Sequence, residues 1–295
     1  MRVQLANSPD SWGVWFPSEP RQIPWQRYLD EVAQAGYRGT ELGPYGYLPT
    51  NSAQLRAELT TRGLQLTAGF VMLPLENPAT YDTVEFETLR VADLLASAGA
   101  GFLVLIDGEY RDLATGITTA PSTLDDDGWK HLVNASNRLG MAVQSRFGLR
   151  LAFHPHADTH VEYEAQAERL VADTDPAYVD ICLDLGHFEY RGGDAVRFFQ
   201  RHSDRITYFH FKSVDREIRA RVDAESLPLN EAVKLGVFCE PDRGTVDYEA
   251  FARSLEAVNF EGWAAVEQDR DPSSFEHALP AARRTLRHFQ KLSLA

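Results

Sequence analysis

Leu151-Ala-Phe-His-Pro-His156 is a short apolar stretch that runs straight into two histidines around a proline. Three later stretches of the chain have the same form, with apolar residues followed by ionisable ones: 179–187, which ends on Asp184 and His187; 206–212, which ends on His210 and Lys212; and 263–267, which ends on Glu267. In a parallel α/β barrel the catalytic groups come from the C-terminal ends of several different strands. The four stretches therefore predict a barrel with a polar site at one end.

The rest of the chain alternates between strand and helix patterns. Strand candidates centre near residues 4, 41, 69, 104, 152, 182, 208 and 265, with helical patterns at 25–35, 55–62, 86–98, 128–147, 161–172, 194–202, 248–258 and 274–292. Such alternation implies a parallel sheet with right-handed crossovers. Eight units in 295 residues fit a closed (β/α)8 TIM barrel, with residues 1–295 in a single domain.

A doubly wound open sheet is the rival architecture for this pattern. Such a sheet usually carries a glycine-rich phosphate loop after its first strand. Here that place holds Asn7-Ser-Pro-Asp-Ser-Trp-Gly13, which is no such loop. The segment 213–243 is long and charged, and within it we expect one short helix at 226–235.

The composition excludes several functional classes. A net charge of -14 and a pI of about 5.1 argue against a basic face for nucleic acid. The two cysteines, Cys182 and Cys239, are far apart in the sequence and indicate no disulfide framework. No apolar run reaches the length of a signal sequence core or a membrane span. We expect a soluble cytoplasmic protein that binds neither nucleic acid nor membrane.

The four strand ends predict one metal site. Histidine nitrogens and carboxylate oxygens from four strands would converge as a set of ligands: His154, Asp184, His210 and Glu267. This mixed set favours Mn2+ or Co2+, with Zn2+ or Mg2+ as further choices, over Ca2+. Each polar group read alone could merely cap a strand, but four of them at similar places favour a site.

At this point the chain resembles the xylose isomerase-like TIM-barrel superfamily of sugar isomerases, epimerases and endonuclease IV. Within it, the likeness is strongest to inosose dehydratases of inositol catabolism. The first half carries the likeness in Asn7–Trp12 and Gly39-Thr-Glu-Leu-Gly43. The second half carries most of it, in His154-Pro-His156, Thr174-Asp-Pro176, Asp184-Leu-Gly-His187, Gly192-Gly-Asp194, His210-Phe-Lys212, Gly236-Val-Phe238, Val246-Asp-Tyr248, Gly262-Trp263 and Val266-Glu267 through Asp271-Pro272.

The resemblance also suggests roles for individual residues. The superfamily usually binds its metal through Glu, Asp, His and Glu, and in this chain His154 takes the place of the first glutamate. In the sugar epimerases the two glutamates exchange protons with opposite faces of the substrate carbon. A metal-bound imidazole is a poor general base, so the exchange of glutamate for His154 weakens an epimerase interpretation. We expect Glu267, Lys212 and His187 to share the acid and base steps.

Substrate contacts are expected from residues around the same strand ends. His156 and Glu41 lie at or near strand ends, and Trp12 lies in the loop after the first strand, although each could equally be structural. Arg243 falls in Cys239-Glu-Pro-Asp-Arg-Gly244, where the dehydratases would have a glycine-rich stretch, and Ala157-Asp-Thr-His160 departs from them too. Both departures lie where a substrate would be contacted, so they leave its identity open.

The leading hypothesis is a metal-dependent lyase that dehydrates a keto-polyol such as an inosose. The alternative is a metal-dependent ketose isomerase or epimerase, which would use the same enolised substrate without losing water. A non-catalytic sugar-binding barrel and an endonuclease-like enzyme are further alternatives, and the negative charge opposes the last. The expected partner is a small polyol or sugar, and a homo-oligomer is left open.

Overall fold

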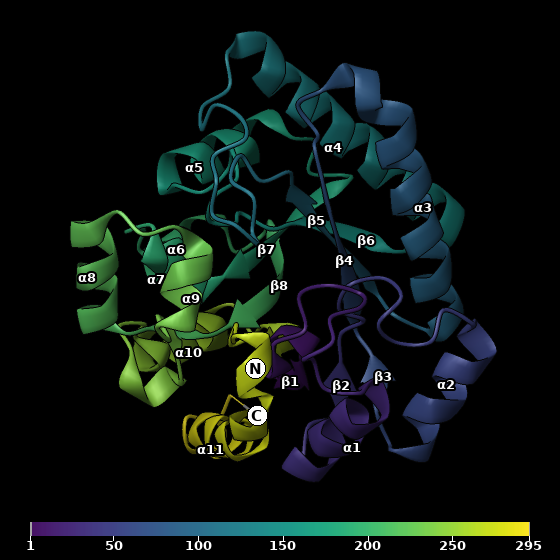
Figure 1. Cartoon of the computed structure of the whole chain (residues 1–295). Helices are drawn as coiled ribbons and strands as arrows, with labels where there is room; N and C mark the ends of the chain where they lie inside the picture. The colour runs from purple at the N-terminus through teal and green to yellow at the C-terminus, as the bar shows by residue number, and fades with distance from the viewer. Residues whose placement is uncertain (1, 295) are drawn as a thin grey trace.

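A closed barrel of parallel strands forms the centre of the molecule in the computed structural model, which describes residues 2–294 (Figure 1). Nine strands pair in parallel in the order β3-β2-β1-β11-β8-β7-β6-β5-β4. Their bounds are β1 (Arg2–Asn7), β2 (Gly39–Thr40), β3 (Gln65–Leu66), β4 (Ala68–Leu73), β5 (Phe102–Asp107), β6 (Arg150–Phe153), β7 (Val179–Asp184), β8 (Ile206–Phe211) and β11 (Glu261–Val266).

The two edge strands of this order, β3 and β4, are consecutive segments of the chain, so the sheet closes on itself. β3 and β4 are one run of residues interrupted only at Thr67, whose N–H donates to Thr40 O at 3.0 Å. β3 pairs with β2, and β4 pairs with β5. The nine strands therefore occupy eight barrel positions, and the predicted (β/α)8 TIM barrel is confirmed.

Eight helices surround the barrel, one after each barrel strand (Figure 1). They are α1 (Trp25–Ala35), α2 (Ser52–Thr61), α3 (Tyr81–Ala98), α4 (Asp126–Phe147), α5 (Glu164–Asp173), α7 (Ala195–His202), α10 (Tyr248–Ala257) and α11 (Ala278–Lys291). Each lies close to a range expected from the sequence. Gly36, Gly99 and Gly148 end three of them with positive φ, a conformation that costs other residues more.

Apolar side chains form two layers. The larger core lies between the strands and the helices, and a smaller cluster fills the barrel interior. The interior cluster includes Ala152, Cys182, Tyr208 and Ala265. Because side chains alternate along a strand, the residue two positions later points to the same interior. This periodicity sets the positions of the site residues.

The sequence interpretation missed two helices. α6 (Leu185–Tyr190) begins directly after β7, and α8 (Arg216–Glu225) lies in the charged segment after β8. Of the α8 residues only Val222 is buried, so this helix has no apolar stripe that periodicity could reveal. The short helix expected at 226–235 is present as α9 (Leu229–Lys234), beside the small antiparallel pair β9 (Ser213–Val214) and β10 (Phe238–Cys239).

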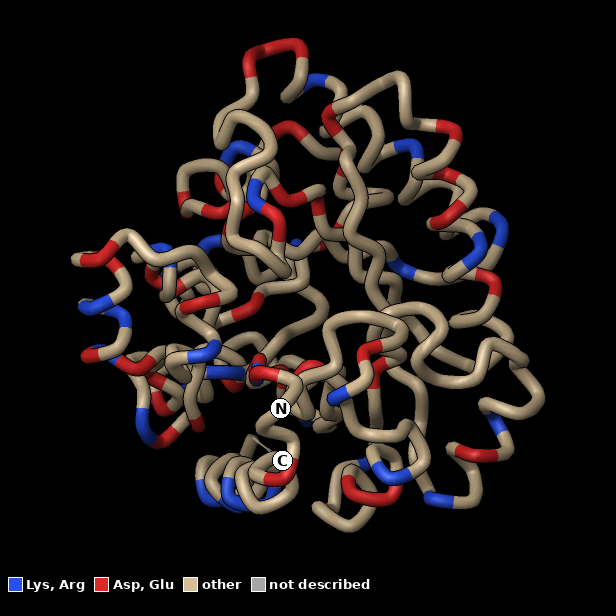
Figure 2. Tube along the Cα trace, viewed as in Figure 1, with Lys and Arg blue, Asp and Glu red and all other residues tan. Residues whose placement is uncertain are grey.

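Short 3-10 helices complete the chain: η1 (Pro9–Trp12), η2 (Pro78–Thr80), η3 (Pro241–Arg243) and η4 (Pro272–His277). Lys and Arg are interspersed with Asp and Glu over the outer helices in Figure 2. No helix among the described residues is both long and apolar enough to cross a membrane. Cys182 and Cys239 are both buried and unbonded.

Candidate functional site

Four ionisable side chains meet at the C-terminal end of the barrel. His154 follows β6, Asp184 ends β7, His210 lies in β8 and Glu267 follows β11. Each is two residues beyond a member of the interior cluster, so all four side chains point into the barrel mouth. One ligand atom from each lies within 4.8 Å of all the others, and all four residues are buried. The structure thus brings together the four residues that the sequence suggested as metal ligands.

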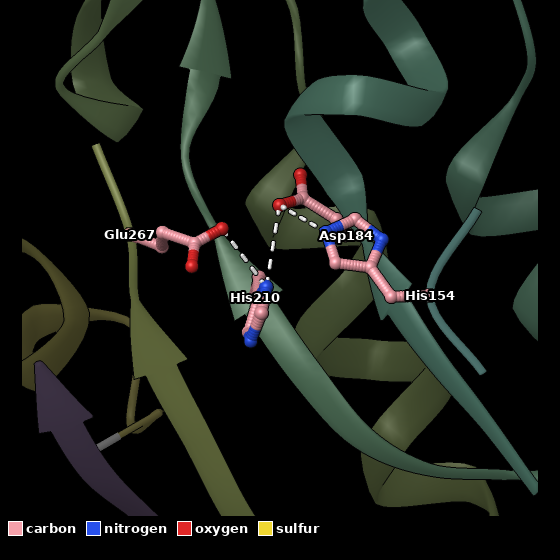
Figure 3. A group of neighbouring side chains, drawn as sticks. All are labelled: His154, Asp184, His210 and Glu267. Carbon is pink, nitrogen blue, oxygen red and sulfur yellow. Dashed lines mark ion pairs between the residues drawn. The ribbon is translucent and has the colours of Figure 1, made fainter. Parts of the chain in front are cut away.

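Asp184 and His210 lie side by side because their strands pair in register (Figure 3). Oδ2 of Asp184 is 3.6 Å from Nδ1 of His210 and 3.6 Å from Nε2 of His154. On the opposite side, Oε2 of Glu267 is 2.9 Å from Nδ1 of His210. Two nitrogens and two carboxylate oxygens therefore face one common centre.

Hydrogen bonds orient both imidazole rings toward that centre. Nδ1 of His154 lies 2.8 Å from the carbonyl oxygen of Pro155, to which it can only donate, so the lone pair of its other nitrogen faces Asp184. Nε2 of His210 lies 3.1 Å from Oε1 of Glu41, which leaves Nδ1 facing the centre. Partners of this kind fix the tautomer and direction of metal-binding histidines.

Two atoms at the centre are suited to bind a cation. Oδ2 of Asp184 and Nδ1 of His210 are buried without a well-aligned hydrogen bond, and their close neighbours are the charged groups of Lys212 and Glu267. Burial, together with the nearby His210, holds the pKa of His154 well below its ordinary value, so this ring is neutral and its lone pair is available. A donor set of two imidazoles and two carboxylates fits Mn2+, Co2+, Zn2+ or Fe2+.

The ammonium of Lys212 is fully buried behind these carboxylates. Its Nζ lies 2.8 Å from Oδ2 of Asp184, 2.9 Å from Oε2 of Glu267 and 2.7 Å from Oδ2 of Asp269. Burial would lower the pKa of Lys212, but the three carboxylates raise it well above its ordinary value. Lys212 therefore stays charged and offsets part of the negative charge at the centre.

Two further histidines line the space beside the centre. The rings of His156 and His187 pack against each other with their centroids 3.9 Å apart and their planes tilted by 39°. Nδ1 of His156 donates to the carbonyl oxygen of Ala157, whereas both ring nitrogens of His187 are buried without a hydrogen-bond partner. Burial and the neighbouring cations lower the pKa of His156 to about 4 and hold the pKa of His187 well below its usual range. Both rings are therefore neutral at physiological pH, and each keeps a lone pair on one nitrogen.

A cavity of about 350 Å³ opens over the centre. Its walls combine aromatic and aliphatic side chains, among them Trp15, Phe16 and Phe238, with histidines and carboxylates. Neither Lys nor Arg is among the described residues that line it. The cavity has the size of a small-molecule site, and its charge suits a neutral ligand rather than an anionic one.

Three residues expected to contact substrate lie elsewhere. Trp12 is fully buried and its indole N–H donates to Glu31 at 2.7 Å. Glu41 is buried behind His210, and Arg243 is exposed in η3; none of the three lines the cavity.

The structure also adds cavity residues that the sequence did not single out, namely Asp10, Glu109 and Asp269. Asp10 lies just after β1 and Glu109 just after β5, and Asp269 is two residues beyond Glu267. In the sequence, only their positions just after strands could have indicated these residues. That position is not specific, because loops after strands often contain acidic residues without a function.

A second cluster, Glu76, Asp107 and His160, also places three ligand types together. Nδ1 of His160 is 2.7 Å from Oδ2 of Asp107, and Nε2 is 3.1 Å from the carbonyl oxygen of Pro121. Both nitrogens therefore donate, and Asp107 helps to raise the pKa of His160 against the effect of burial. A doubly protonated ring has no lone pair for a metal, so this cluster is a structural ion pair.

One aspartate ties together the loops that cover the cavity. Asp158, after β6, accepts from Nη2 of Arg191 at 2.5 Å and from the backbone N–H of Leu229 at 3.3 Å. Its carbonyl oxygen accepts from the N–H of Tyr110, in the loop after β5, at 3.0 Å. Nε of Arg191 also lies 2.7 Å from Oε2 of Glu162. The roof over the cavity is therefore held by a buried ion-pair network.

Comparison with known proteins supports the architecture. A family model described as xylose isomerase-like TIM barrel matches residues 29–292. Inosose dehydratase from Geobacillus thermodenitrificans (strain NG80-2) is 29% identical over 288 residues, which cover 95% of each chain.

Solved structures agree in fold. A crystal structure of the IOLI protein with a bound zinc atom superimposes with a TM-score of 0.74 at 15% identity, covering 99% of this chain and 98% of that one. D-Allulose 3-epimerase from Methylomonas sp., in complex with D-allulose, gives a TM-score of 0.71 at 15% identity, covering 98% and 97%. At such low identities these two likenesses establish the fold alone.

Proposed function

The chain belongs to the xylose isomerase-like TIM barrel family, and from this premise we propose that it is a metal-dependent lyase that removes water from a keto-polyol such as an inosose. The observation that carries the proposal is the convergence of the four ligand atoms beneath a cavity that also holds neutral histidines. The similarity to inosose dehydratase over nearly the whole chain favours this reaction over others of the family. The absence of Lys and Arg from the described cavity wall favours a neutral polyol over a sugar phosphate.

The metal site would be formed by His154, Asp184, His210 and Glu267. An ion there, Mn2+ or Co2+ by preference with Zn2+ or Mg2+ as alternatives, would supply Lewis acidity toward the substrate carbonyl. Glu41 and the Pro155 carbonyl hold the two imidazoles in position.

His187 is the base that best fits the geometry. Its ring lines the cavity and both ring nitrogens are free of hydrogen-bond partners within the protein, so a lone pair is placed to approach the proton next to the substrate carbonyl. Glu267 suits metal binding better than proton transfer, because His210 and Lys212 overcome the effect of burial and lower its pKa to about 2. Lys212 holds the carboxylates in place, and His156 packs against His187 with its Nε2 available to a substrate hydroxyl.

A ketose epimerase is the second candidate, favoured by the fold shared with D-allulose 3-epimerase. That reaction needs a proton-exchanging group on each face of the substrate carbon. His154 replaces one of the two carboxylates that the family's epimerases would use for this, and its Nδ1 is already bonded to a carbonyl oxygen. The site is therefore asymmetric, which suits elimination better than epimerisation.

Product mass separates the candidates. The metal-loaded protein would be incubated with inososes and with ketoses, with chelator-treated protein as the control, and the products analysed by mass spectrometry. A metal-dependent loss of one water supports the lyase. A new compound of unchanged mass would replace it with an epimerase or isomerase, and binding without conversion would indicate a non-catalytic sugar-binding barrel.

A further inference from the structure

We propose that Glu109 is the general acid that protonates the departing hydroxyl in the dehydration, an inference that rests on the proposed lyase function. Elimination of water needs a base at the carbon next to the carbonyl and an acid at the hydroxyl one carbon further. His187 and the metal ligands account for the first, whereas Glu267 and Lys212, the other residues expected to share these steps, are paired with each other at the metal site.

The position of Glu109 suits this step. It lies two residues after the end of β5, on the same end of the barrel as the metal ligands, and it lines the same cavity. A bridge between Glu109 and Thr159 ties its backbone to the loop after β6. Its Oε1 is buried and makes no hydrogen bond. A carboxyl group is thus held at the cavity wall, and one of its oxygens has no partner within the protein.

The charges around Glu109 keep its proton in place. Asp158 and Asp112 are the carboxylates that face it, and no ion pair of the described residues includes Glu109. The guanidinium of Arg191 is engaged by Asp158 and Glu162, and Arg111 lies 4.0 Å from Asp158. Tyr110 donates to Glu162 rather than to Glu109. Burial, with the two aspartates, raises the pKa of Glu109 to about 8.

The other carboxylates of the cavity are less suited to donate a proton. Glu267 faces His210 and Lys212 as an anion, and Asp269 is bonded to Lys212 at 2.7 Å. Asp10 already accepts the hydroxyl of Ser8 at 2.6 Å. Glu109 alone of these combines a protonated state near neutral pH with a buried oxygen that has no partner.

The proposed step balances in atoms and electrons. His187 takes the proton from the carbon next to the carbonyl, and the C–H electron pair forms the new carbon–carbon double bond. The C–O bond at the next carbon breaks toward oxygen, and the proton of Glu109 passes to that oxygen, so that water leaves. Exchange with solvent then removes the proton from His187 and returns one to Glu109.

The test compares Glu109→Gln with the wild type on two leaving groups. Glutamine keeps the size of the side chain but has no acidic proton. With a keto-polyol that bears a β-hydroxyl, we expect dehydration to fall by about 10²- to 10⁴-fold. With the analogue that carries fluoride in place of that hydroxyl, fluoride release should stay near the wild-type rate, since fluoride departs without a full proton transfer. Exchange of the adjacent C–H with deuterated water should also persist, because it needs only the base.

The pH profile gives a second measurement. Wild-type dehydration should decline above about pH 8, as Glu109 loses its proton, and the residual Glu109→Gln rate should lack this decline. Glu189→Gln is the matched control, since Glu189 is a partly buried carboxyl away from the cavity wall whose pKa burial raises to about 7. Its rates and alkaline decline should be those of the wild type.

The outcomes separate this inference from the proposed function. If Glu109→Gln slows water and fluoride loss equally, or slows neither, Glu109 is not the general acid, whatever the enzyme does. If the metal-loaded wild type shows neither elimination nor C–H exchange with any keto-polyol tested, the lyase proposal itself fails.

Discussion

The carboxylate of Glu41 lies 3.1 Å from Nε2 of His210, on the side of the ring opposite Nδ1, which faces Asp184 and Glu267. Glu41 follows β2 and His210 lies in β8, so the pair joins distant parts of the barrel. A carboxylate that accepts the outer N–H fixes the ring and raises the basicity of its inner nitrogen. Glu41 would therefore act on a bound metal through His210, and it does not line the cavity.

Replacing Glu41 should weaken metal binding. We expect Glu41→Leu to lower the affinity for Mn2+ about 10- to 100-fold, because it removes the partner of Nε2. Glu41→Gln, which keeps an oxygen acceptor but no charge, should fall between this variant and the wild type. Calorimetric titration of the chelator-treated protein measures both. The control is Glu31→Gln, a buried carboxylate that bonds Trp12 instead, and equal affinities in all four proteins would remove Glu41 from the site.

Two variants at Asp184 should distinguish its role in metal binding from its role in capping a helix. Its Oδ1 accepts the N–H of His187 at 2.8 Å and so caps α6, whereas Oδ2 faces the metal centre. Asp184→Asn should keep the cap and lose the metal, while Asp184→Ala should lose the metal and about 1 kcal/mol of unfolding free energy as well. Elemental analysis and denaturant melts of the metal-free proteins check this. Full metal occupancy in Asp184→Asn would contradict the ligand set.

Lys212 should stabilise the metal-free protein more than the metal-bound one. Its ammonium contacts the same oxygens of Asp184 and Glu267 that face the metal centre. In Lys212→Met these buried carboxylates lose their counter-charge, so we expect the chelator-treated protein to lose about 3–5 kcal/mol of stability. Added Mn2+ should restore part of that loss, as thermal melts with and without the ion would show.

A surface lysine provides the control for this variant. Lys234 pairs with Glu231 on the exposed side of α9, where such a bridge contributes about 1 kcal/mol or less. Lys234→Met should therefore melt like the wild type with or without metal. If Lys212→Met did the same, the three ion pairs of Lys212 would have no role in holding the site.

The sequence was sufficient to predict the barrel and to suggest the ligand set, because both depend on a pattern that is local in the sequence. An apolar strand that ends in histidine or carboxylate is a local pattern, and it occurs four times with His154, Asp184, His210 and Glu267 at the ends. Closure of the sheet then brings four ends together without any pairing information from the sequence.

Contacts that depend on packing between distant loops could not be found this way. Trp12 ends η1 after β1 just as Glu109 follows β5, yet Trp12 turns inward onto Glu31 and Glu109 reaches the cavity. Arg243 differs from the residue expected by resemblance but lies on the surface. Only the three-dimensional course of these loops distinguishes such cases.

Glu109 should also lower the stability of the protein at alkaline pH. Its pKa is about 8 in the folded chain, against an ordinary value of 4.5, so the folded state holds a proton that the unfolded state has released. Between these two values the unfolded state binds fewer protons, and the stability contributed by this group must fall as pH rises.

Glu109→Gln has no such group. Relative to the wild type, its melting temperature should therefore gain progressively from about pH 5 to about pH 8 and then level off. Glu189→Gln should show the same trend but level off near pH 7, because its pKa is about 7. Thermal melts of the metal-free proteins across this range measure the effect without any substrate. A difference between Glu109→Gln and the wild type that does not vary with pH would mean that Glu109 ionises in the folded protein as it does in water, and it would then have no proton to give at neutral pH.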